Sequence, residues 1–381
     1  MPRLLVDGTA LGPASKGVGR YAYNLCVQAA LRLPADWDIV VARFPQPLPR
    51  FPEHFKASFI TLPRASDLFK GLYLMPQLVR RVRPHVLLRP MEGAGYDYGV
   101  PMITVCHDIT TLIRQAARQP FNLWRGIVDR VNEHFQIRAM KASAMVVCNS
   151  NFIRDAVERT YGISHERTAL GYCGVDPRFY EMARCVDRGL VLRKYAVDRY
   201  VLTFATGDFR EGFDLLPDIV KAMKNRGIDS CLMIAGVELG SRYVDELRSR
   251  LGEFGLIEGR DFMFEGFLPE DRLADLVALY TAADFYLELS RHEGFGMQLA
   301  EAMACGTSCI ASMAGALRET AGGFAIEIDP TDACGVVSAI ADAYRRGEHK
   351  RDNTRQVEFT RKFDWTSVGK LIVEKVLQLA G

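Results

Sequence analysis

The chain lacks the features that would place it in a membrane, at a metal ion or in an oxidising compartment. Its apolar runs are short and interrupted by charge, which excludes a transmembrane span. Its first residues indicate a strand rather than a signal peptide, since no long apolar region or cleavage site follows them. No Cys/His cluster has zinc-like spacing, and no repeat or low-complexity segment is evident.

The chain has nine cysteines, an odd number, and most of them lie in apolar runs. Cys106, Cys148 and Cys231 are examples. Cysteines in such positions are typical of buried, reduced thiols. We therefore expect a cytoplasmic protein without a disulfide framework.

The chain also has little excess of either sign of charge, because its net charge is only +2. Residues 1–185 nevertheless contain 24 Lys and Arg against 15 Asp and Glu, and the remainder carries a net charge of −7. A basic first half suits an anionic partner such as a lipid diphosphate or a membrane surface. A chance split between two solvated halves explains it equally well. The basic residues are scattered and no recognition motif accompanies them, so nucleic acid is not an expected partner.

The length of 381 residues predicts two domains. Short apolar runs alternate with helical stretches, a pattern typical of parallel sheets buried on both faces. Two such sheets give two doubly wound α/β domains, which we place at residues 1–185 and 186–362. The predicted strands are residues 3–6, 39–43, 86–89, 102–106 and 144–148 in the first domain, and 200–205, 231–235, 261–264, 285–289, 308–311 and 325–328 in the second.

The most informative stretch runs from Ser290 to Gly306. In it Glu293 precedes the turn Gly294–Gly296, and Met297–Ala304 predicts a helix that contains Glu301. A glycine-rich turn into a helix N-terminus offers backbone N–H groups and a positive dipole end, which suit a phosphate. Carboxylates on either side would accept hydrogen bonds from the hydroxyls of a sugar nucleotide. A pair of glutamates at this spacing is weak evidence by itself, because most glutamates on helices are simply solvated.

This stretch resembles the E-x7-E motif of the retaining glycosyltransferases of family 4, which have the GT-B fold with two facing doubly wound domains and a cleft between them. The resemblance implies transfer of a hexose from a nucleoside diphosphate sugar to an acceptor hydroxyl, with retention of configuration. The first domain would be the acceptor side and the second the nucleotide-sugar domain. Phe363-Asp-Trp365 and the helix after it, residues 363–381, resemble the family's final helix, which crosses back to the first domain.

The resemblance also bears on cofactors. No Asp-x-Asp motif lies in a suitable loop, so we expect no metal and no cofactor, the sugar nucleotide being a co-substrate. Backbone amides and Arg210 would then stabilise the leaving diphosphate.

The first half contains a glycine-rich segment after the first strand. Gly17 and Gly19 precede a helix expected at about Tyr21, and the segment looks like the family's loop over the donor diphosphate, with Lys16 and Arg20 on the acceptor side. Its spacing is not that of the dinucleotide fingerprint. A flexible loop before a helix cap is the alternative.

A second segment, Val105-Cys-His107-Asp108, resembles the family's V-H-D sequence at a strand end. His107 would line the donor pocket and take part in catalysis, and Asp108 would order the loop or the acceptor. A lone histidine after a strand is more often structural, and that alternative stays open.

The segment Thr206–Leu215 corresponds to the family's phosphate loop but departs from its pattern. The family lysine that neutralises the donor phosphates aligns with Glu211, which leaves Arg210 as the cation. Since a carboxylate would repel a diphosphate, we expect Glu211 to point away. The departure keeps open a second hypothesis, a degenerate sugar-nucleotide-binding protein without turnover.

The site implied by the resemblance has three parts. Catalysis would involve His107, Glu293 and Arg210. Glu293 would orient the sugar and Glu301 would bind the ribose. The donor-binding set as a whole is Gly17, Gly19, Gly207, Arg210, Gly266, Phe267, Leu268, Glu293, Gly294, Phe295, Gly296, Met297 and Glu301.

No residue in the sequence identifies the donor or the acceptor. We favour GDP-mannose because mannosyl donors are frequent among such chains, with UDP-linked hexoses next, and a glycan or lipid-linked glycan as acceptor. Residues 68–83, with Arg80, Arg81 and Arg83 at their end, predict either an amphipathic helix in peripheral contact with the inner face of a membrane or an ordinary surface helix. A nucleotide-sugar epimerase on the same fold is a further alternative, although no acid/base constellation for it is evident.

Overall fold

The computed structural model describes residues 1–12, 17–53, 55–109, 112 and 123–381. Of these, residues 1–112, 123–174 and 364–381 form one compact unit and residues 175–363 form a second. The sequence-based boundary after residue 185 assigns α7 (Pro177–Ala183) to the first domain, whereas α7 packs on α11 (Leu273–Ala282) and α12 (Met297–Ala304) of the second unit. Within the described residues, no helix is long and apolar enough to cross a membrane.

The first unit contains a seven-stranded parallel sheet with the strand order β3-β2-β1-β4-β5-β6-β7. All five runs predicted for this half are strands. Two strands were not predicted, because β3 is a largely exposed edge strand and β7 is only three residues long. The strands are β1 (Arg3–Asp7), β2 (Asp38–Arg43), β3 (Ser58–Thr61), β4 (Val86–Arg89), β5 (Met102–Cys106), β6 (Met145–Cys148) and β7 (Thr168–Leu170).

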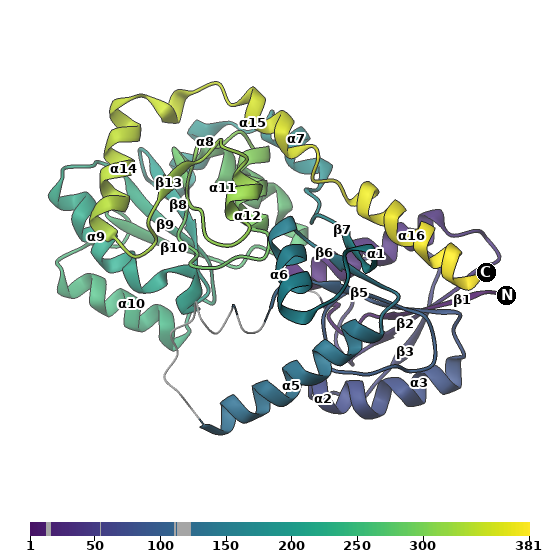
Figure 1. Ribbon diagram of the computed structural model, residues 1–381. Coiled ribbons are helices and arrows are strands. Elements are labelled where there is room, and N and C mark those ends of the chain that lie inside the picture. The colour runs from purple at the N-terminus through teal and green to yellow at the C-terminus, as the bar shows by residue number, and fades with distance from the viewer. Residues whose placement is uncertain (13–16, 54, 110–111, 113–122) are drawn as a thin grey trace. The chain divides into compact units, whose positions relative to one another are not determined.

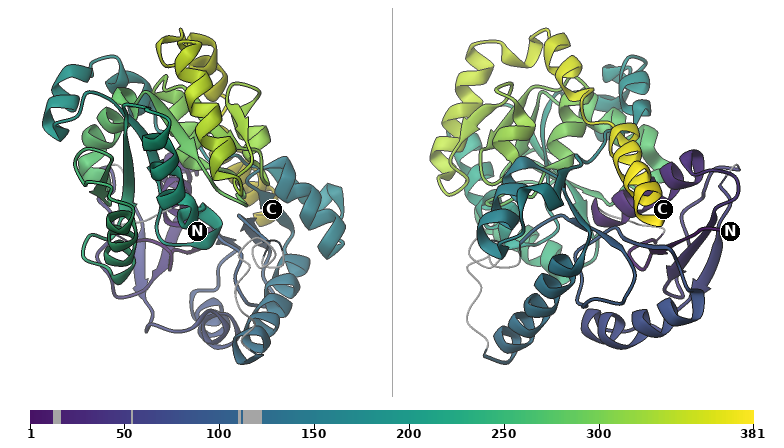
Figure 2. Two further views of the ribbon diagram at one scale, coloured as in Figure 1. Left: turned by 90° about the vertical axis from the view of Figure 1, so that its left-hand side faces the viewer. Right: turned by 45° about the vertical axis from the view of Figure 1, so that its right-hand side comes forward.

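Helices cover this sheet, and the C-terminal helix is one of them. The apolar side of α3 packs on β1, β2 and β4, and α16 packs along α1, where Trp365 meets Tyr21 edge to face. The right-hand view of Figure 2 shows the yellow α16 beside the purple α1. The described helices are α1 (Gly17–Arg32), α2 (Asp67–Phe69), α3 (Met75–Val82), α5 (Leu123–Ala142), α6 (Asn151–Tyr161) and α16 (Trp365–Ala380).

Residues 68–83 are not the single amphipathic helix that the sequence predicted. A π-helical turn, Lys70–Leu74, separates α2 from α3. The side chain of Lys70 is buried, with its Nζ 3.2 Å from Asp7 Oδ2 and 3.1 Å from Thr9 Oγ1. Burial disfavours the charge of Asp7, but Lys70 and Thr9 outweigh it and lower the pKa of this carboxyl group. Lys70 therefore adds nothing to a basic surface.

The second unit contains a six-stranded parallel sheet with the order β10-β9-β8-β11-β12-β13, so the prediction of two parallel sheets is confirmed. Each of the six runs predicted for this half corresponds to one strand. The strands are β8 (Tyr200–Phe204), β9 (Cys231–Val237), β10 (Phe262–Gly266), β11 (Phe285–Glu288), β12 (Cys309–Ser312) and β13 (Ile326–Ile328).

Helices form layers against the second sheet, as Figure 1 shows. The largest core cluster joins the strands to α9, α10 and α14, while α11 and α12 pack on one another and on α7. Both faces of the sheet are thereby buried, as near-continuous apolar strands require. The described helices of this unit not yet given are α8 (Arg188–Tyr195), α9 (Leu216–Asn225), α10 (Arg242–Glu253), α13 (Leu317–Ala321), α14 (Ala333–Arg345) and α15 (Thr354–Thr360).

Candidate active site

The strand order of the second unit marks one place on its sheet. After β8 the chain adds β9 and β10 on one side, and it then returns to add β11, β12 and β13 on the other. β8 and β11 are therefore neighbours at a topological switch point, outside which open α/β sheets bind their ligands. The loops that leave these two strands contain Arg210 and Glu293, so the topology brings the two predicted segments to one edge of the sheet.

The Glu293 loop is held in place through its backbone. The Glu293 carbonyl accepts a hydrogen bond of 2.8 Å from Ala316 N, and the Ser290 and Phe295 carbonyls accept hydrogen bonds from Ser312 and Thr320 hydroxyls. Phe295 is buried. The loop is thus a rigid frame for its single carboxylate rather than a mobile turn.

The helix after this loop begins where the sequence predicted. Gly296 is the N-cap of α12 with φ 88° and ψ 61°, a left-handed conformation that favours glycine. A Cβ here would lie 2.5 Å from Leu317 Cδ2, so space as well as conformation selects glycine. The amides of the first turn of α12 thus follow directly on the Gly294–Gly296 turn.

Glu301 lies inside α12 and is buried. Its Oε2 accepts a hydrogen bond of 3.2 Å from the Tyr280 hydroxyl of α11. A buried carboxylate is costly unless it is hydrogen-bonded. Glu301 therefore differs from most glutamates on helices, which are solvated.

Arg210 contacts Asp208 within its own loop. Its Nε and Nη2 donate to Asp208 Oδ2 at 3.0 and 2.8 Å. Burial disfavours the charge of Asp208, but the hydrogen bonds from Arg210 outweigh it and lower the pKa of Asp208. The guanidinium group is therefore held in a defined position by an acidic partner.

Glu211, the departure from the family pattern, turns back toward the end of β8. Its carboxylate accepts hydrogen bonds from both the backbone N and the hydroxyl of Thr206. Burial is the main cause that raises its pKa. The Glu211 carboxylate thus accepts the hydrogen bond of a backbone N–H that could otherwise bind an anionic ligand of this loop.

Arg291 joins the two loops, a role that the sequence did not indicate. Its guanidinium nitrogens donate to the two Asp214 carboxylate oxygens at 2.6 and 3.0 Å and to the Phe209 carbonyl at 2.6 Å. Its backbone N donates to the Arg210 carbonyl at 2.6 Å, and its guanidinium lies 4.1 Å from the Phe209 ring centroid. A bidentate pair of this kind fixes orientation as well as distance. Nothing in the sequence marked Arg291 and Asp214 as partners.

The other predicted donor-binding residues of this unit lie at or after the ends of β10 and β8. Gly266 ends β10, with Phe267 half-buried and Leu268 buried after it. Gly207 follows β8 with φ 93°, and a Cβ there would lie 3.1 Å from the Tyr243 ring. Among the described residues, no group of three or more His, Cys, Asp or Glu could hold a metal ion.

His107 lies in the first unit and is buried. Its Nε2 is 2.8 Å from the Pro90 carbonyl, its backbone N donates to Glu92 Oε2 at 2.8 Å, and its ring meets Tyr21 edge to face. Burial lowers the pKa of His107 to about 4, so the ring is neutral at neutral pH and its Nε2–H donates to Pro90. Burial also raises the pKa of Glu92, which sequence reasoning missed, to about 8.

The glycine-rich segment differs from its prediction in one respect. α1 begins at Gly17 rather than at about Tyr21, so Gly17 and Gly19 lie in the first turn of the helix and not in a loop. Arg20 is half-buried in the same turn, and Asp108 Oδ1 accepts a hydrogen bond of 2.8 Å from Ile109 N. Lys16 lies outside the described residues.

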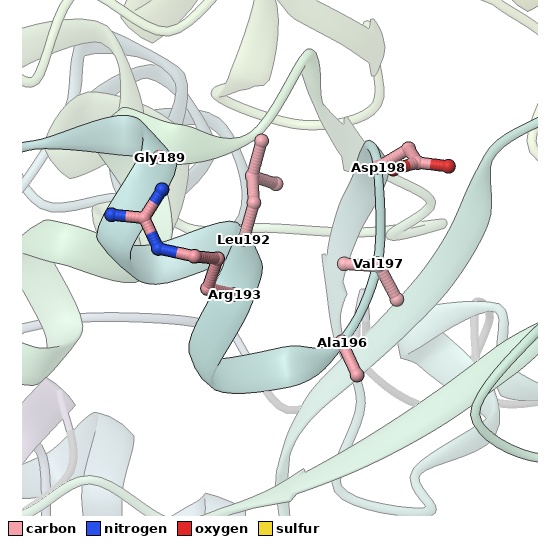
Figure 3. A pocket seen from close by; sticks show the side chains of 6 residues that line it. All are labelled: Gly189, Leu192, Arg193, Ala196, Val197 and Asp198. Carbon is pink, nitrogen blue, oxygen red and sulfur yellow. The ribbon is translucent and has the colours of Figure 1, made fainter.

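A surface hollow beside α8 contains none of these residues. Figure 3 shows it lined by Gly189, Leu192, Arg193, Ala196, Val197 and Asp198. It follows neither β8 nor β11 and has no glycine-rich turn into a helix. The loops at the switch point therefore remain the candidate site.

Comparison with known proteins identifies the family to which the chain is similar. The family model of the glycosyl transferases group 1 matches residues 199–346, and that of glycosyltransferase family 4 matches residues 15–179. The GDP-mannose-dependent alpha-(1-6)-phosphatidylinositol dimannoside mannosyltransferase of Mycobacterium tuberculosis is 29% identical over 276 residues, 68% of this chain and 67% of that protein.

Two solved structures are similar over their whole length. Sucrose-phosphate synthase from Thermosynechococcus elongatus has a TM-score of 0.74 at 18% identity, with 100% of this chain and 99% of that one covered. Anabaena HepE in complex with UDP and glucose has a TM-score of 0.72 at 18% identity, with 99% of each chain covered. The predicted fold class, GT-B with two doubly wound domains, is confirmed.

The close approach at Gly315 generates a prediction. Gly315 has φ 62°, and a Cβ there would lie 2.4 Å from the Glu293 carbonyl oxygen. We expect Gly315→Ala to lower the free energy of unfolding by about 1–3 kcal/mol in urea titration, because backbone cannot move aside as a side chain can. Gly323→Ala is the control, since Gly323 has φ 81° and open space around it. Equal losses in the two variants would show that the contact with Glu293 does not constrain this turn.

Proposed function

The chain belongs to the glycosyltransferases of group 1, family 4, and we propose that it transfers a hexose, with retention of configuration, from a nucleoside diphosphate sugar to a glycan or lipid-linked glycan. The observation that carries this proposal is the pairing of the Glu293 loop with the Arg210 loop at the switch point. A loop fixed by its backbone, a carboxylate at its centre and a helix N-terminus after it suit a sugar diphosphate.

We favour mannose from GDP-mannose as the donor. The mycobacterial relative is GDP-mannose-dependent by its name, which supports this choice. HepE, whose fold is similar, binds UDP and glucose, so UDP-linked hexoses stand next. In the proposed site Glu293 orients the sugar and the amides of Gly294, Phe295, Gly296 and Met297 lie beside it. Glu301 binds the ribose.

The proposed reaction needs no metal and no covalent nucleophile. The departing phosphate takes the proton of the acceptor hydroxyl on the same face of the sugar. Arg210 and the first-turn amides of α12 stabilise the negative charge that develops on the leaving diphosphate. Because Asp208 already holds the Arg210 guanidinium, little reorganisation is needed when the donor binds.

In the first unit, His107 lines the donor pocket in our proposal, and Lys16, Arg20 and Asp108 belong to the acceptor side. A neutral, buried His107 serves as a hydrogen-bonding and packing group rather than as a cation. Gly17 and Gly19 at the start of α1 offer backbone N–H groups to the donor diphosphate.

A sugar-nucleotide binder without turnover is the second candidate, and Glu211 favours it. Its carboxylate lies in the loop where the family has a phosphate-binding lysine, and it already accepts the Thr206 N–H. Such a protein would bind a donor and transfer nothing.

We also propose a peripheral membrane contact through residues 68–83. Phe69 and Tyr73 are 50% and 54% exposed, and Arg80, Arg81 and Arg83 are exposed after them. Aromatic side chains beside a basic cluster suit the interface of an anionic bilayer. The buried Lys70 takes no part.

The donor proposal predicts a nucleotide-dependent thermal shift. GDP or GDP-mannose should raise Tm, in the presence of EDTA as in its absence, because a ligand at 100 times its Kd adds about 2.7 kcal/mol to the free energy of unfolding. Glu301→Gln, which removes the charge and keeps the shape, should weaken this shift. The control is the exposed Glu327→Gln. If neither GDP, UDP, ADP nor any of their sugar conjugates moves Tm, the donor site is not where we place it.

Substitution of Glu211 distinguishes the two candidate functions, the transferase and the sugar-nucleotide binder without turnover. We expect wild-type protein to transfer hexose, and Glu211→Lys to bind the donor more tightly, by about tenfold or 1.4 kcal/mol, because repulsion of the diphosphate becomes attraction. Glu211→Gln is the matched variant that removes the charge alone. The measurements are donor KM and the anomeric configuration of the product by NMR. Transfer by Glu211→Lys but not by wild type would establish the non-catalytic binder.

The membrane contact predicts binding to anionic vesicles. Phe69→Ser with Tyr73→Ser, and separately Arg80→Glu with Arg81→Glu, should reduce co-sedimentation, each arginine contributing about 1 kcal/mol at low salt. Leu190→Ser is the control, since Leu190 is an exposed apolar side chain of the second unit. Equal binding of all variants to anionic and neutral vesicles would exclude this surface.

A further inference from the structure

Three residues at the end of β11 form a chain of oxygen contacts that the proposed reaction does not use. Glu288 is the last residue of the strand and is 6% exposed. Its Oε1 lies 2.7 Å from Ser290 Oγ, and the same Oγ lies 3.0 Å from Glu293 Oε1. One hydroxyl thus links a buried carboxyl group to the carboxylate that we place at the sugar.

The number of protons in this chain is limited. A serine hydroxyl has a single proton and can donate one full hydrogen bond. If both glutamates were ionised, one of the two contacts would set oxygen lone pairs against each other. Two negative carboxylates would then share one hydroxyl. A second proton between Glu288 and Glu293 removes the conflict.

The other partners of Glu288 are compatible with a proton on its Oε1. The Tyr286 hydroxyl donates to Oε2 at 2.7 Å, and Ser290 N donates to Oε1 at 3.1 Å. A protonated Oε1 can accept from Ser290 N and donate to Ser290 Oγ, which then donates to Glu293. Every contact in the chain then has one donor and one acceptor. Glu293 is half-buried, so the more deeply buried Glu288 is the better place for the proton.

We propose that Glu288 is a protonated positioning acid, which holds Glu293 as an oriented carboxylate through the hydroxyl of Ser290. This inference rests on the proposed role of Glu293 at the donor sugar. A fixed carboxylate presents its acceptor oxygens to the sugar hydroxyls without paying for reorientation when the donor binds.

Several titratable groups face Glu288 from other elements. Burial is the main cause that raises its own pKa and outweighs the hydrogen bonds from Ser290 and Tyr286. Glu211 from the loop after β8 and Cys309 from β12 are its electrostatic neighbours. Burial raises the pKa values of Tyr286 and Cys309 far above the ordinary ones, so both stay protonated in the neutral range. A charge on Glu288 would raise the pKa of Glu211, so the two carboxyl groups disfavour ionising together.

The arrangement makes the site sensitive to the ionisation of Glu288. When Glu288 loses its proton, Ser290 donates to Glu288 over the shorter contact, and the hydrogen bond from Ser290 to Glu293 is lost. Activity should therefore fall as the pH rises through the pKa of Glu288. The free energy of unfolding should fall over the same range, since an acid with a raised pKa binds more protons in the folded state.

The first test is infrared spectroscopy of the whole protein, which does not depend on turnover. A protonated carboxyl C=O band should be present at neutral pH, disappear at alkaline pH and be missing in Glu288→Gln. Glu92→Gln and Glu211→Gln are the comparison variants, because the pKa values of both side chains are raised. A neutral-pH spectrum in which Glu288→Gln removes no protonated band would overturn the proposal, whether or not the protein proves to be a transferase.

The second test is kinetic and distinguishes positioning from structure. Ser290→Ala and Glu288→Leu should lower kcat/KM for the donor about 10- to 100-fold, the size of loss that a misplaced catalytic group causes. Glu288→Gln should recover most of it, because its amide N–H can still donate to Ser290, and should lose part of the alkaline limb of the pH profile. Ser338→Ala on α14 controls for removal of a hydroxyl. A Glu288→Gln enzyme as impaired as Glu288→Leu, or with an unchanged pH profile, would contradict the proposal, provided that its Tm matches that of wild type.

Discussion

The candidate site depends on one ion pair. Arg291 donates to both Asp214 oxygens and to the Phe209 carbonyl, and its backbone N binds the Arg210 carbonyl. These contacts tie the loop after β11 to the loop after β8. Parallel strands bring two such loops to one edge of a sheet, but nothing in a sheet fixes their distance from each other. A mostly buried bidentate pair does, because breaking it would leave an uncompensated charge.

The first unit also has buried charges where two neighbouring strands lead into loops. Its switch point lies between β1 and β4, and buried charges stand at the ends of both strands. Asp7 ends β1 and pairs with Lys70, while Arg89 ends β4 and donates to the Gly93 and Ala94 carbonyls. The loops after these two strands are thus anchored by buried charges, through an ion pair at Asp7 and through backbone carbonyls at Arg89. The cost of burying these charges is offset by a defined loop position, which a sugar-nucleotide site requires.

The sequence alone predicts the strands of this protein better than it predicts the contacts within the candidate site. Apolar runs predicted eleven strands, because burial on both faces leaves a strong signal, and Gly294–Gly296 predicted the start of α12. The edge strand β3 gave no such signal, since most of its side chains are exposed. Contacts between distant residues, such as Arg291 with Asp214, depend on where loops meet. No local pattern encodes that, and Glu288 was predicted only as part of an apolar strand, with no role in the site.

The site contains several buried or half-buried carboxyl groups, and each is accommodated differently. Glu211 accepts hydrogen bonds from Thr206, Glu301 accepts one from Tyr280, and Asp208 pairs with Arg210. Glu288 and Glu293 meet on the Ser290 hydroxyl, and in our proposal a proton on Glu288 resolves that contact. A diphosphate adds further negative charge to any site that binds it. A glutamate that stays neutral at neutral pH contributes its hydrogen bond without adding to that charge, which is the physical reason to bury an acid at this strand end.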